Sequence, residues 1–348
     1  MTDAALSLAV NDVIDGFTVV RVLGSEHASR TFLVRRSIGA EVVVLKYCRP
    51  QSLEAAVLQQ VSHPGVCQLL GQGGEPNSAY LLLSSSGQRA LPTCVEQGIA
   101  VKVLRDFVLQ IAAALEALHA HGFAHGDLRP EHVLIAPNQQ AVLIDLHCAY
   151  RLDSKPQAAD YDDGSLAYLS PERIRGVILG ENLSPSSASD YYSLGVIIFQ
   201  MLSGQLPFSD DTPELLIQSH LNDSTPRLPS HLQAFQPLVD GLMRKDIEQR
   251  IASPSEIRKL LDAVNDDSEL ARRVIRDSAI NTQELSSLFA DLRLRPDELA
   301  KRDKRLRRKR QRRIALQSSV AIILSGSVLA GLFSFREELL PVVEEAAA

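Results

Sequence analysis

The pattern of apolar residues changes partway along the first 264 residues, and this change constrains the fold more than any other feature. Residues 17–47 and the stretch YLLLS at 80–84 are rich in Val, Leu and Phe, as β-strands usually are. Residues 103–122 instead repeat apolar side chains at the spacing of a helix. The sequence therefore predicts an α+β fold in which a small strand-rich lobe precedes a larger helical lobe.

A second strong feature is the uncharged segment 314–335, IALQSSVAIILSGSVLAGLFSF. At about 1.5 Å per residue its helix would be roughly 33 Å long, enough to cross the hydrocarbon core of a bilayer. A buried helix is the alternative, but charged residues at both ends favour a membrane span. Ten Lys or Arg precede it within residues 301–313, so the positive-inside rule predicts a single-pass protein with its large N-terminal part in the cytoplasm.

These two features divide the chain into five predicted parts. They are an N-terminal extension at 1–16, a folded domain at 17–264, a basic helical juxtamembrane linker at 265–313, a transmembrane helix at 314–335 and a short extracytoplasmic tail at 336–348. The linker's cations could also contact anionic lipid headgroups. The span could bring two copies together as a homodimer.

The charge of the chain is unevenly distributed. The net charge is −6, but outside residues 301–313 the chain has 26 basic and 41 acidic residues, a balance of −15. Since nucleic-acid binding relies on positive surface, this acidic body argues against a nucleic-acid partner.

The four cysteines, Cys48, Cys67, Cys94 and Cys148, are scattered without a CxxC pair. We find no Cys/His cluster with the spacing of a zinc site, so the sequence indicates neither a structural zinc nor a disulfide framework.

Several short motifs occur in a telling order. They are VVLK at 43–46, HP at 63–64, HGDLRP at 125–130, LIDLHC at 143–148, GSLAYLSPE at 164–172 and DYYSLGVIIFQMLSGQLPF at 190–208. In order and spacing, residues 17 to about 264 resemble a eukaryotic-type Ser/Thr protein kinase domain of the kind also found in bacteria. The resemblance implies a bilobal kinase fold, ATP and Mg²⁺ or Mn²⁺ as cofactors, and a protein substrate phosphorylated on Ser or Thr.

The same resemblance implies roles for the matching residues. Lys46 would contact the ATP phosphates and be held there by Glu54. Asp127 would orient the substrate hydroxyl or accept its proton, and Arg129 stands in place of the usual Lys near the γ-phosphate. Asp145 would ligate the metal, with His132 at the second metal position.

The remaining roles concern nucleotide binding and support. The nucleotide would contact Gly24, Lys46, Leu83, Ser84 and Ser86. Glu172 is expected to pair with Arg250, and Asp190 to hold the backbone of the catalytic loop.

Four departures from the kinase pattern bear on activity. Only Gly24 remains of three loop glycines, with Glu26 and Ser29 at the other two positions, so nucleotide affinity should be reduced. His132 replaces a metal-ligating Asn, and an imidazole suits Mn²⁺ better than Mg²⁺.

The other departures lie in LIDLHC and HGDLRP. Leu146 and His147 replace Phe and Gly; Leu146 can fill the apolar stack with Leu58, Leu69 and His125, and His tolerates a positive φ better than most residues. Gly126 stands where many kinases have an Arg that pairs with a phosphorylated loop residue, so the usual phosphate-operated switch is lost. Without that partner, Asp160, Asp162 and Asp163 form a solvated acidic loop rather than a phosphate mimic.

Three functions are consistent with these residues. The first is an active membrane-anchored Ser/Thr kinase, because Lys46, Glu54, Asp127 and Asp145 are all present. The second is a pseudokinase that serves as a scaffold or nucleotide-binding signalling module. The third is a small-molecule phosphotransferase, since HGDLRP also resembles the loop of antibiotic-type kinases, although SPE, DYYSLG and Arg250 argue against it.

Overall fold

The computed structural model describes residues 8–24, 30–37, 40–48, 52–75, 79–85, 89–91, 101–154, 161, 164–209 and 212–264. All of these belong to one compact unit of the chain, residues 1–279. Within this described part, every helix is too short or too polar to cross a bilayer. The predicted linker, transmembrane helix and tail lie outside the described residues.

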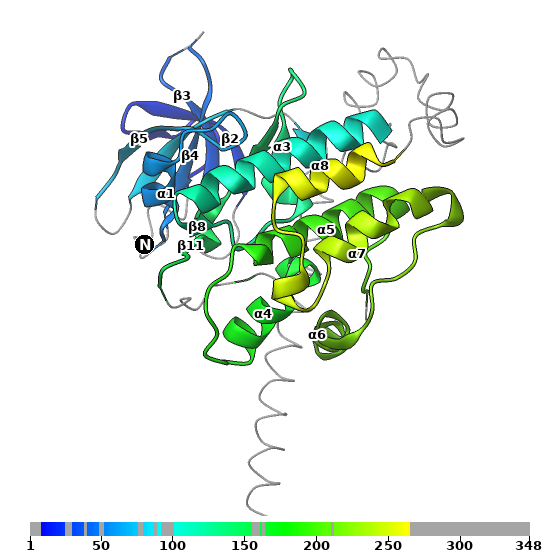
Figure 1. The fold of residues 1–348 in the computed structure, drawn as a ribbon. Coiled ribbons are helices and arrows are strands. Elements are labelled where there is room, and N and C mark those ends of the chain that lie inside the picture. The colour runs from blue at the N-terminus through cyan, green and yellow to red at the C-terminus, as the bar shows by residue number, and fades with distance from the viewer. Residues whose placement is uncertain are drawn as a thin grey trace, which may run out of the picture. The chain divides into compact units, whose positions relative to one another are not determined.

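The small lobe is built on an antiparallel sheet in the order β1-β2-β3-β4-β6-β5 (Figure 1). Its strands are β1 (Val13–Ile14), β2 (Phe17–Gly24), β3 (Thr31–Arg35), β4 (Val43–Tyr47), β5 (Leu69–Gly73) and β6 (Tyr80–Ser84). The strands β2, β3, β4 and β6 fall where the sequence predicts strands. Strand β5, which is half-buried and contains two glycines, was not predicted.

The alternation of side chains along β4 directs Lys46 toward the interior. Leu45 and Tyr47 face a small core on one side of the sheet together with Phe32. Val44 packs instead against the larger core, which includes residues of α1 (Glu54–Gln60). Since residues two apart in a strand share a face, Lys46 lies on the same side as Val44 and faces α1.

The large lobe is helical. Its helices are α3 (Val101–Ala120), α4 (Pro171–Arg173), α5 (Ala188–Ser203), α6 (Pro213–Asn222), α7 (Gln236–Leu242) and α8 (Pro254–Asp262), with short turns η2 (Pro130–His132), η3 (Leu146–Cys148), η4 (Ser165–Tyr168), η5 (Ile174–Ile178), η6 (Ser230–Phe235) and η7 (Ile247–Gln249). Helices α6 and α8 have clear start signals: Thr212 and Ser253 cap the first turn through their side-chain oxygens, and each is followed by a proline.

Helix α3 is the centre of this lobe. Its side chains Ile111, Leu115 and Leu118 are fully buried, and it lies alongside α8 with α5 close by (Figure 1). Arg105 of α3 also donates to Asp262 of α8 at 2.8 Å. The predicted helices in 103–122 and 190–208 are therefore present, and the predicted bilobal α+β arrangement is confirmed.

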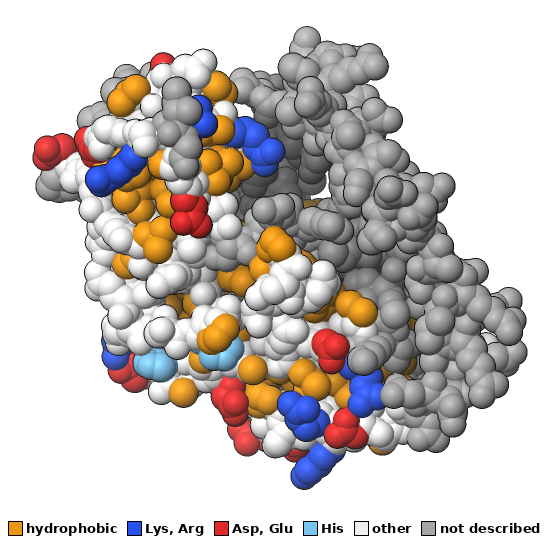
Figure 2. All heavy atoms as spheres, turned by 90° about the horizontal axis from the view of Figure 1, so that it is seen from above, with side chains coloured by type: hydrophobic (Ala, Val, Ile, Leu, Met, Phe, Trp, Pro, Cys, Tyr) orange, Lys and Arg blue, Asp and Glu red, His pale blue; other side chains and the backbone are white. Residues whose placement is uncertain are grey.

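Short ladders between the lobes position the loops that carry the motifs. Strand β8 (Phe123–Ala124) pairs with β11 (Tyr150–Arg151), and β9 (Val133–Ile135) pairs with β10 (Ala141–Leu143) and with β7 (Arg89–Ala90). The loop after β8 and the segment after β10 consequently lie side by side. Viewed from above, onto the small lobe, the surface carries hydrophobic side chains with a few Lys and Arg beside them (Figure 2).

Candidate active site

Lys46 is held between two carboxylates. Its Nζ lies 2.7 Å from both carboxylate oxygens of Glu54 and 2.6 Å from Oδ1 of Asp145. Lys46 and Glu54 are buried. Glu54 also accepts the backbone N–H of Leu146 at 3.2 Å, which ties α1 to the segment after β10. The structure thus brings together the predicted ion pair and the predicted metal-binding carboxylate.

The electrostatics keep this group charged. Burial by itself lowers the pKa of Lys46, but the carboxylates of Glu54 and Asp145 outweigh burial and raise it. Burial would raise the pKa of Asp145, yet the Lys46 ammonium and the hydrogen bond from His147 hold it well below its usual value. Asp145 is therefore ionised at neutral pH, as a carboxylate that binds a divalent cation must be.

Asp190 of α5 fixes the start of the catalytic loop. Its Oδ2 accepts the backbone N–H of His125 at 2.8 Å, and its Oδ1 accepts that of Gly126 at 3.0 Å. His119 Nε2 lies 2.8 Å from the same carboxylate. Burial would raise the pKa of Asp190, but the hydrogen bond and charge of His119 lower it. The buried carboxylate and the two amides satisfy one another, as predicted for this residue.

Asp127 lies in this loop with one oxygen available. The residue is buried, and its Oδ1 has no hydrogen-bond partner among the described residues. Its Oδ2 is 3.5 Å from His132 Nδ1. A buried carboxylate oxygen without a donor is costly to keep, so its retention suits a group that accepts a proton from a ligand.

His132 occupies the predicted second metal position beside Asp145. Its Nδ1 lies 2.7 Å from the carbonyl oxygen of Asp127, and its Nε2 lies 3.6 Å from Oδ2 of Asp145. Arg129 Nε approaches Nε2 of the same ring at 3.4 Å. Asp145 offers the hard oxygen that Mg²⁺ prefers, whereas His132 offers only nitrogen, so the residues fit one metal position well and the second less well.

The expectation that position 147 would need an unusual backbone is wrong. The positive φ of this segment falls at Asp145, with φ 61° and ψ 64°, and His147 lies in the ordinary turn η3. The strain is therefore carried by an Asp, one of the residue types that tolerate the left-handed region. The side chain of His147 is used instead, because its Nδ1 lies 2.5 Å from Asp145 Oδ1.

Gly126 is required by local geometry. Its φ is +80°, and a Cβ at this position would lie 2.2 Å from the carbonyl oxygen of Cys148. Any larger residue, including the Arg of many kinases, would have to displace the chain after Asp145. The glycine at this position therefore has a steric reason in addition to the absence of a phosphate switch.

Tyr161 replaces that switch with a neutral contact that the sequence analysis missed. Its hydroxyl donates to the carbonyl oxygen of Gly126 at 3.0 Å and accepts from Arg173 Nε at 3.1 Å. The guanidinium of Arg173 also lies 4.2 Å from the ring centre of Tyr150. The signal available in the sequence was an aromatic residue inside an otherwise polar loop. Asp160, Asp162 and Asp163 lie outside the described residues.

The buried pair Glu172 and Arg250 supports the large lobe. Arg250 Nη1 and Nη2 donate to the two carboxylate oxygens of Glu172 at 2.6 Å and 2.9 Å. Ser189 Oγ donates to the same carboxylate at 2.7 Å. The predicted pairing is thus formed with the two-pronged geometry that suits a guanidinium.

The predicted nucleotide contacts are only partly within the described residues. Leu83 is buried and Ser84 is half-buried on β6, which pairs with β4 next to Lys46. Gly24 ends β2, while Glu26, Ser29 and Ser86 lie outside the described residues. The weakened nucleotide affinity expected from the lost glycines stays a prediction.

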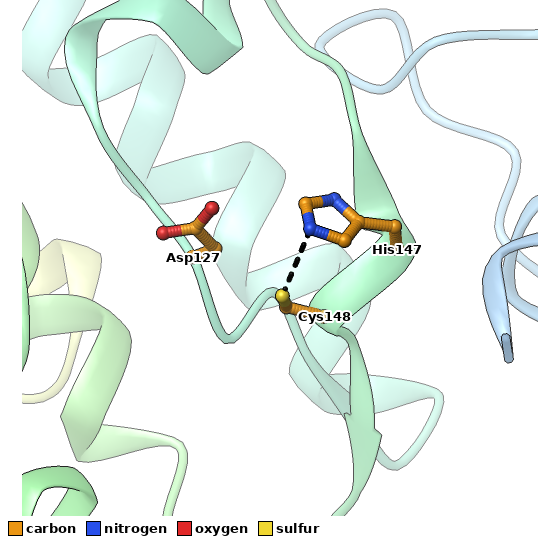
Figure 3. Close-up of side chains that lie close together, drawn as sticks. All are labelled: Asp127, His147 and Cys148. Atoms are coloured by element: carbon orange, nitrogen blue, oxygen red, sulfur yellow. Dashed lines mark hydrogen bonds between the residues drawn. The ribbon is translucent and has the colours of Figure 1, made fainter. Parts of the chain in front are cut away.

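One cluster contradicts the expectation drawn from the cysteines. Asp127, His147 and Cys148 lie close enough to share a metal ion, and His147 Nε2 is 3.1 Å from Cys148 Sγ (Figure 3). The sequence did contain the adjacent His and Cys, but their proximity to Asp127 depends on the pairing of β8 with β11. A pattern search along the chain could not have found that proximity.

A lysine shared by two carboxylates, a buried loop aspartate and a bilobal fold together define the protein-kinase class of phosphotransferase. Comparison with known families agrees: residues 17–262 match the model of the protein kinase domain, and the chain belongs to this family.

Three curated relatives are all named as kinases. The chain is 26% identical over 227 residues to "Probable serine/threonine-protein kinase PknB" of Lactococcus lactis, covering 63% of this chain and 35% of the relative. It is 28% identical over 265 residues to serine/threonine-protein kinase PknA of Mycobacterium tuberculosis, covering 74% and 57%. It is 32% identical over 161 residues to the serine/threonine-protein kinases drp72 of Corynebacterium efficiens, covering 46% and 30%. The matched part thus spans less than two thirds of each relative.

Proposed function

We propose that this chain is an active Ser/Thr protein kinase that transfers the γ-phosphate of ATP to protein hydroxyls. The observation that carries the proposal is the position of Lys46, 2.7 Å from Glu54 and 2.6 Å from Asp145. Helix α1 and the metal-binding carboxylate are both in the places that phosphoryl transfer needs. The names of the relatives favour Ser and Thr as acceptors.

The residues divide the chemistry as follows. Lys46 neutralises charge on the α- and β-phosphates, and Glu54 keeps it there. A divalent ion held by Asp145, with His132 as a second ligand, neutralises phosphate charge when it is bound. Asp127 aligns the acceptor hydroxyl and takes its proton through the oxygen without a partner among the described residues. The Arg129 guanidinium stabilises negative charge that develops on the transferred group.

The test uses two variants with different expected effects. Asp127→Asn should abolish phosphate transfer and leave nucleotide binding largely intact, because this residue contacts the acceptor. Lys46→Met should weaken both. The exposed Asp106→Asn is the control and should behave like the parent. A parental rate of transfer in Asp127→Asn would overturn the proposal and assign the activity to a contaminant.

A pseudokinase scaffold is the second candidate. It is favoured by His132, which offers nitrogen at the second metal position and contacts the Asp127 carbonyl oxygen instead. Binding of ATP to the full chain with either metal, without transfer to any Ser or Thr peptide, would support this candidate. A small-molecule phosphotransferase is less well supported, because the Glu172–Arg250 pair and the named relatives belong to protein kinases.

We also propose that residues 314–335 anchor the chain in a membrane, with the kinase domain in the cytoplasm and residues 336–348 on the other side. The proposal is supported by the uncharged run and by the ten cations before it. The full chain should remain with membranes after alkaline extraction, and truncation after Arg313 should release it. A tag after Ala348 that is reached by protease from the cytoplasmic side would contradict this topology.

A further inference from the structure

The residues that replace the usual Phe-Gly after the metal-binding Asp create a cluster that phosphoryl transfer does not need. Among the described residues, His147 and Cys148 of η3 and Asp127 of the catalytic loop place a nitrogen, a sulfur and an oxygen within 4.8 Å of one another. The close-up shows the three side chains converging from the two neighbouring segments (Figure 3). Such a set of N, S and O atoms suits a borderline ion such as Zn²⁺.

The Asp127 oxygen provides an independent indication that a ligand is missing. Asp127 is only 3% exposed, yet its Oδ1 has no hydrogen-bond partner in the described part of the chain. A buried carboxylate oxygen with no donor lowers stability unless a cation or a ligand donor completes it. A cation at the cluster would do so.

The orientation of His147 is that of a metal ligand. Its Nδ1 lies 2.5 Å from Asp145 Oδ1, and its Nε2 is the nitrogen directed at Cys148 Sγ, 3.1 Å away. Histidines that bind metals usually donate the second ring N–H to a carboxylate, which fixes the tautomer and the ring direction. Asp145 provides that carboxylate, so Nε2 is the nitrogen available to a metal.

We propose that Asp127, His147 and Cys148 form an inhibitory zinc site. Zn²⁺ would bind Oδ1 of Asp127, Nε2 of His147 and the thiolate of Cys148, and the thiol proton would be released to solvent. Three protein ligands leave the fourth tetrahedral position to water. The site differs from the Mg²⁺ or Mn²⁺ position, which uses oxygen from Asp145.

The inhibition follows from the ligand that the two sites share functionally. With zinc on its Oδ1, Asp127 can no longer accept the proton of a substrate hydroxyl. Excess Mg²⁺ should not compete effectively, because Mg²⁺ has little affinity for thiolate and imidazole. This part of the inference rests on the proposed kinase activity, whereas the binding of zinc does not.

The first measurement is therefore binding, made on the purified full chain with a phosphine reductant that does not compete for zinc. Cobalt(II) is the probe, because a thiolate ligand gives an intense charge-transfer absorption and a tetrahedral site gives visible bands. The parent should show both and lose them when one equivalent of zinc is added. Cys148→Ser and Cys148→Ala should lose the charge-transfer band, while the control Cys48→Ser should keep it.

A second binding variant tests the carboxylate. Asp127→Asn should weaken zinc binding by at least about tenfold, measured by competition with a chromophoric chelator. A parental cobalt spectrum in both Cys148 variants would overturn the site, as would the absence of any thiolate band in the parent.

The activity measurement follows at a fixed, saturating concentration of Mg²⁺ and ATP. Zinc should inhibit the parent and Cys48→Ser at concentrations at least about tenfold below those that inhibit Cys148→Ser, each compared with its own zinc-free rate. Equal inhibition of the parent and the Cys148 variants would overturn the inhibitory role. If the chain transfers no phosphate at all, the proposed function fails, but the cobalt and chelator measurements still decide whether the site exists.

Discussion

At the scale of single residues, His132 links the architecture of the site to its choice of metal. Its imidazole lies between the catalytic loop and Asp145, 3.6 Å from Oδ2 of that carboxylate. We expect the parent to transfer phosphate faster with Mn²⁺ than with Mg²⁺, because Mn²⁺ accepts nitrogen ligands more readily. His132→Asn restores an oxygen ligand.

The variant should therefore lower the ratio of the Mn²⁺ rate to the Mg²⁺ rate by roughly tenfold, the equivalent of about 1.4 kcal/mol. The measurement is the initial rate of peptide phosphorylation with each metal. The exposed His121→Asn is the matched control and should leave the ratio unchanged. Equal parental rates with both metals would remove the argument from His132.

Gly126 gives a second prediction at this scale. Gly126→Ala should lower the free energy of unfolding more than Gly122→Ala, although both glycines have nearly the same φ, +80° and +79°. Both variants incur the strain of about 1–2 kcal/mol for a left-handed residue. Only at 126 would the Cβ also meet a carbonyl oxygen, at 2.2 Å, whereas position 122 has nothing within 4 Å.

Urea denaturation of the two variants measures this difference. The loss at position 126 should exceed the loss at 122 by at least about 1 kcal/mol, the lower end of the cost of overpacking. Equal losses would mean that the segment carrying Cys148 moves aside easily. In that case the missing Arg of this chain would have no steric explanation.

At the scale of an element, the segment between β11 and α4 is fastened by Tyr161. Tyr161→Phe would leave the buried guanidinium of Arg173 without this hydroxyl, and Nη1 of Arg173 already has no partner among the described residues. Because the lost hydrogen bond involves a charged group, we expect the free energy of unfolding to fall by about 1.5–3 kcal/mol.

Tyr168→Phe is the matched control for this prediction. Its hydroxyl donates to the neutral Gln200 side chain at 2.8 Å, so its loss should cost only about 0.5–1.5 kcal/mol. Thermal or urea unfolding of both variants gives the comparison. A Tyr161 variant as stable as the parent would show that the contact does not hold the segment.

The same scale shows how far the sequence could lead. Strands β2, β3, β4 and β6 and helices α3 and α5 were predictable, because long runs of apolar residues with a clear period leave few alternatives. The pairs Lys46–Glu54 and Glu172–Arg250 were predictable through the order of the motifs. Strand β5, with its glycines and half-buried residues, has no such period.

The contacts that could not be predicted join segments that the motifs do not connect. Tyr161 reaches Gly126, and His147 and Cys148 approach Asp127, only because β8 pairs with β11 in a register of two residues. The backbone strain at Asp145 rather than at His147 is likewise a property of the turn. Residue types at these positions give no information on distances across the ladder.

At the scale of the whole molecule, buried histidines make stability depend on pH. Burial, followed by the nearby charge of Lys245, lowers the pKa of His220 to about 3. The unfolded chain has an ordinary histidine near 6.5, so below that pH it binds a proton that the folded state does not. The contribution is fully present above pH 6.5 and is lost as the pH falls toward 3.

The free energy of unfolding should therefore fall by about 1.4 kcal/mol for each pH unit below about 6 because of this group alone. His220→Asn keeps a polar group next to Tyr192, whose hydroxyl lies 3.0 Å from His220 Nδ1. The variant should show a shallower dependence between pH 6.5 and 5 in urea denaturation. The same slope in parent and variant would mean that His220 is protonated in the folded state.

The two carboxylates around Lys46 also determine how this amine reacts with chemical reagents. An amine must lose its proton before it can attack an acylating reagent, and the pKa of Lys46 is raised by Glu54 and Asp145 against the opposing effect of burial. While α1 holds Glu54 in place, Lys46 should therefore be labelled far more slowly than solvent-exposed lysines. The labelling rate would rise only when α1 moves away, so a mass-spectrometric time course at this one residue reports how often the small lobe opens.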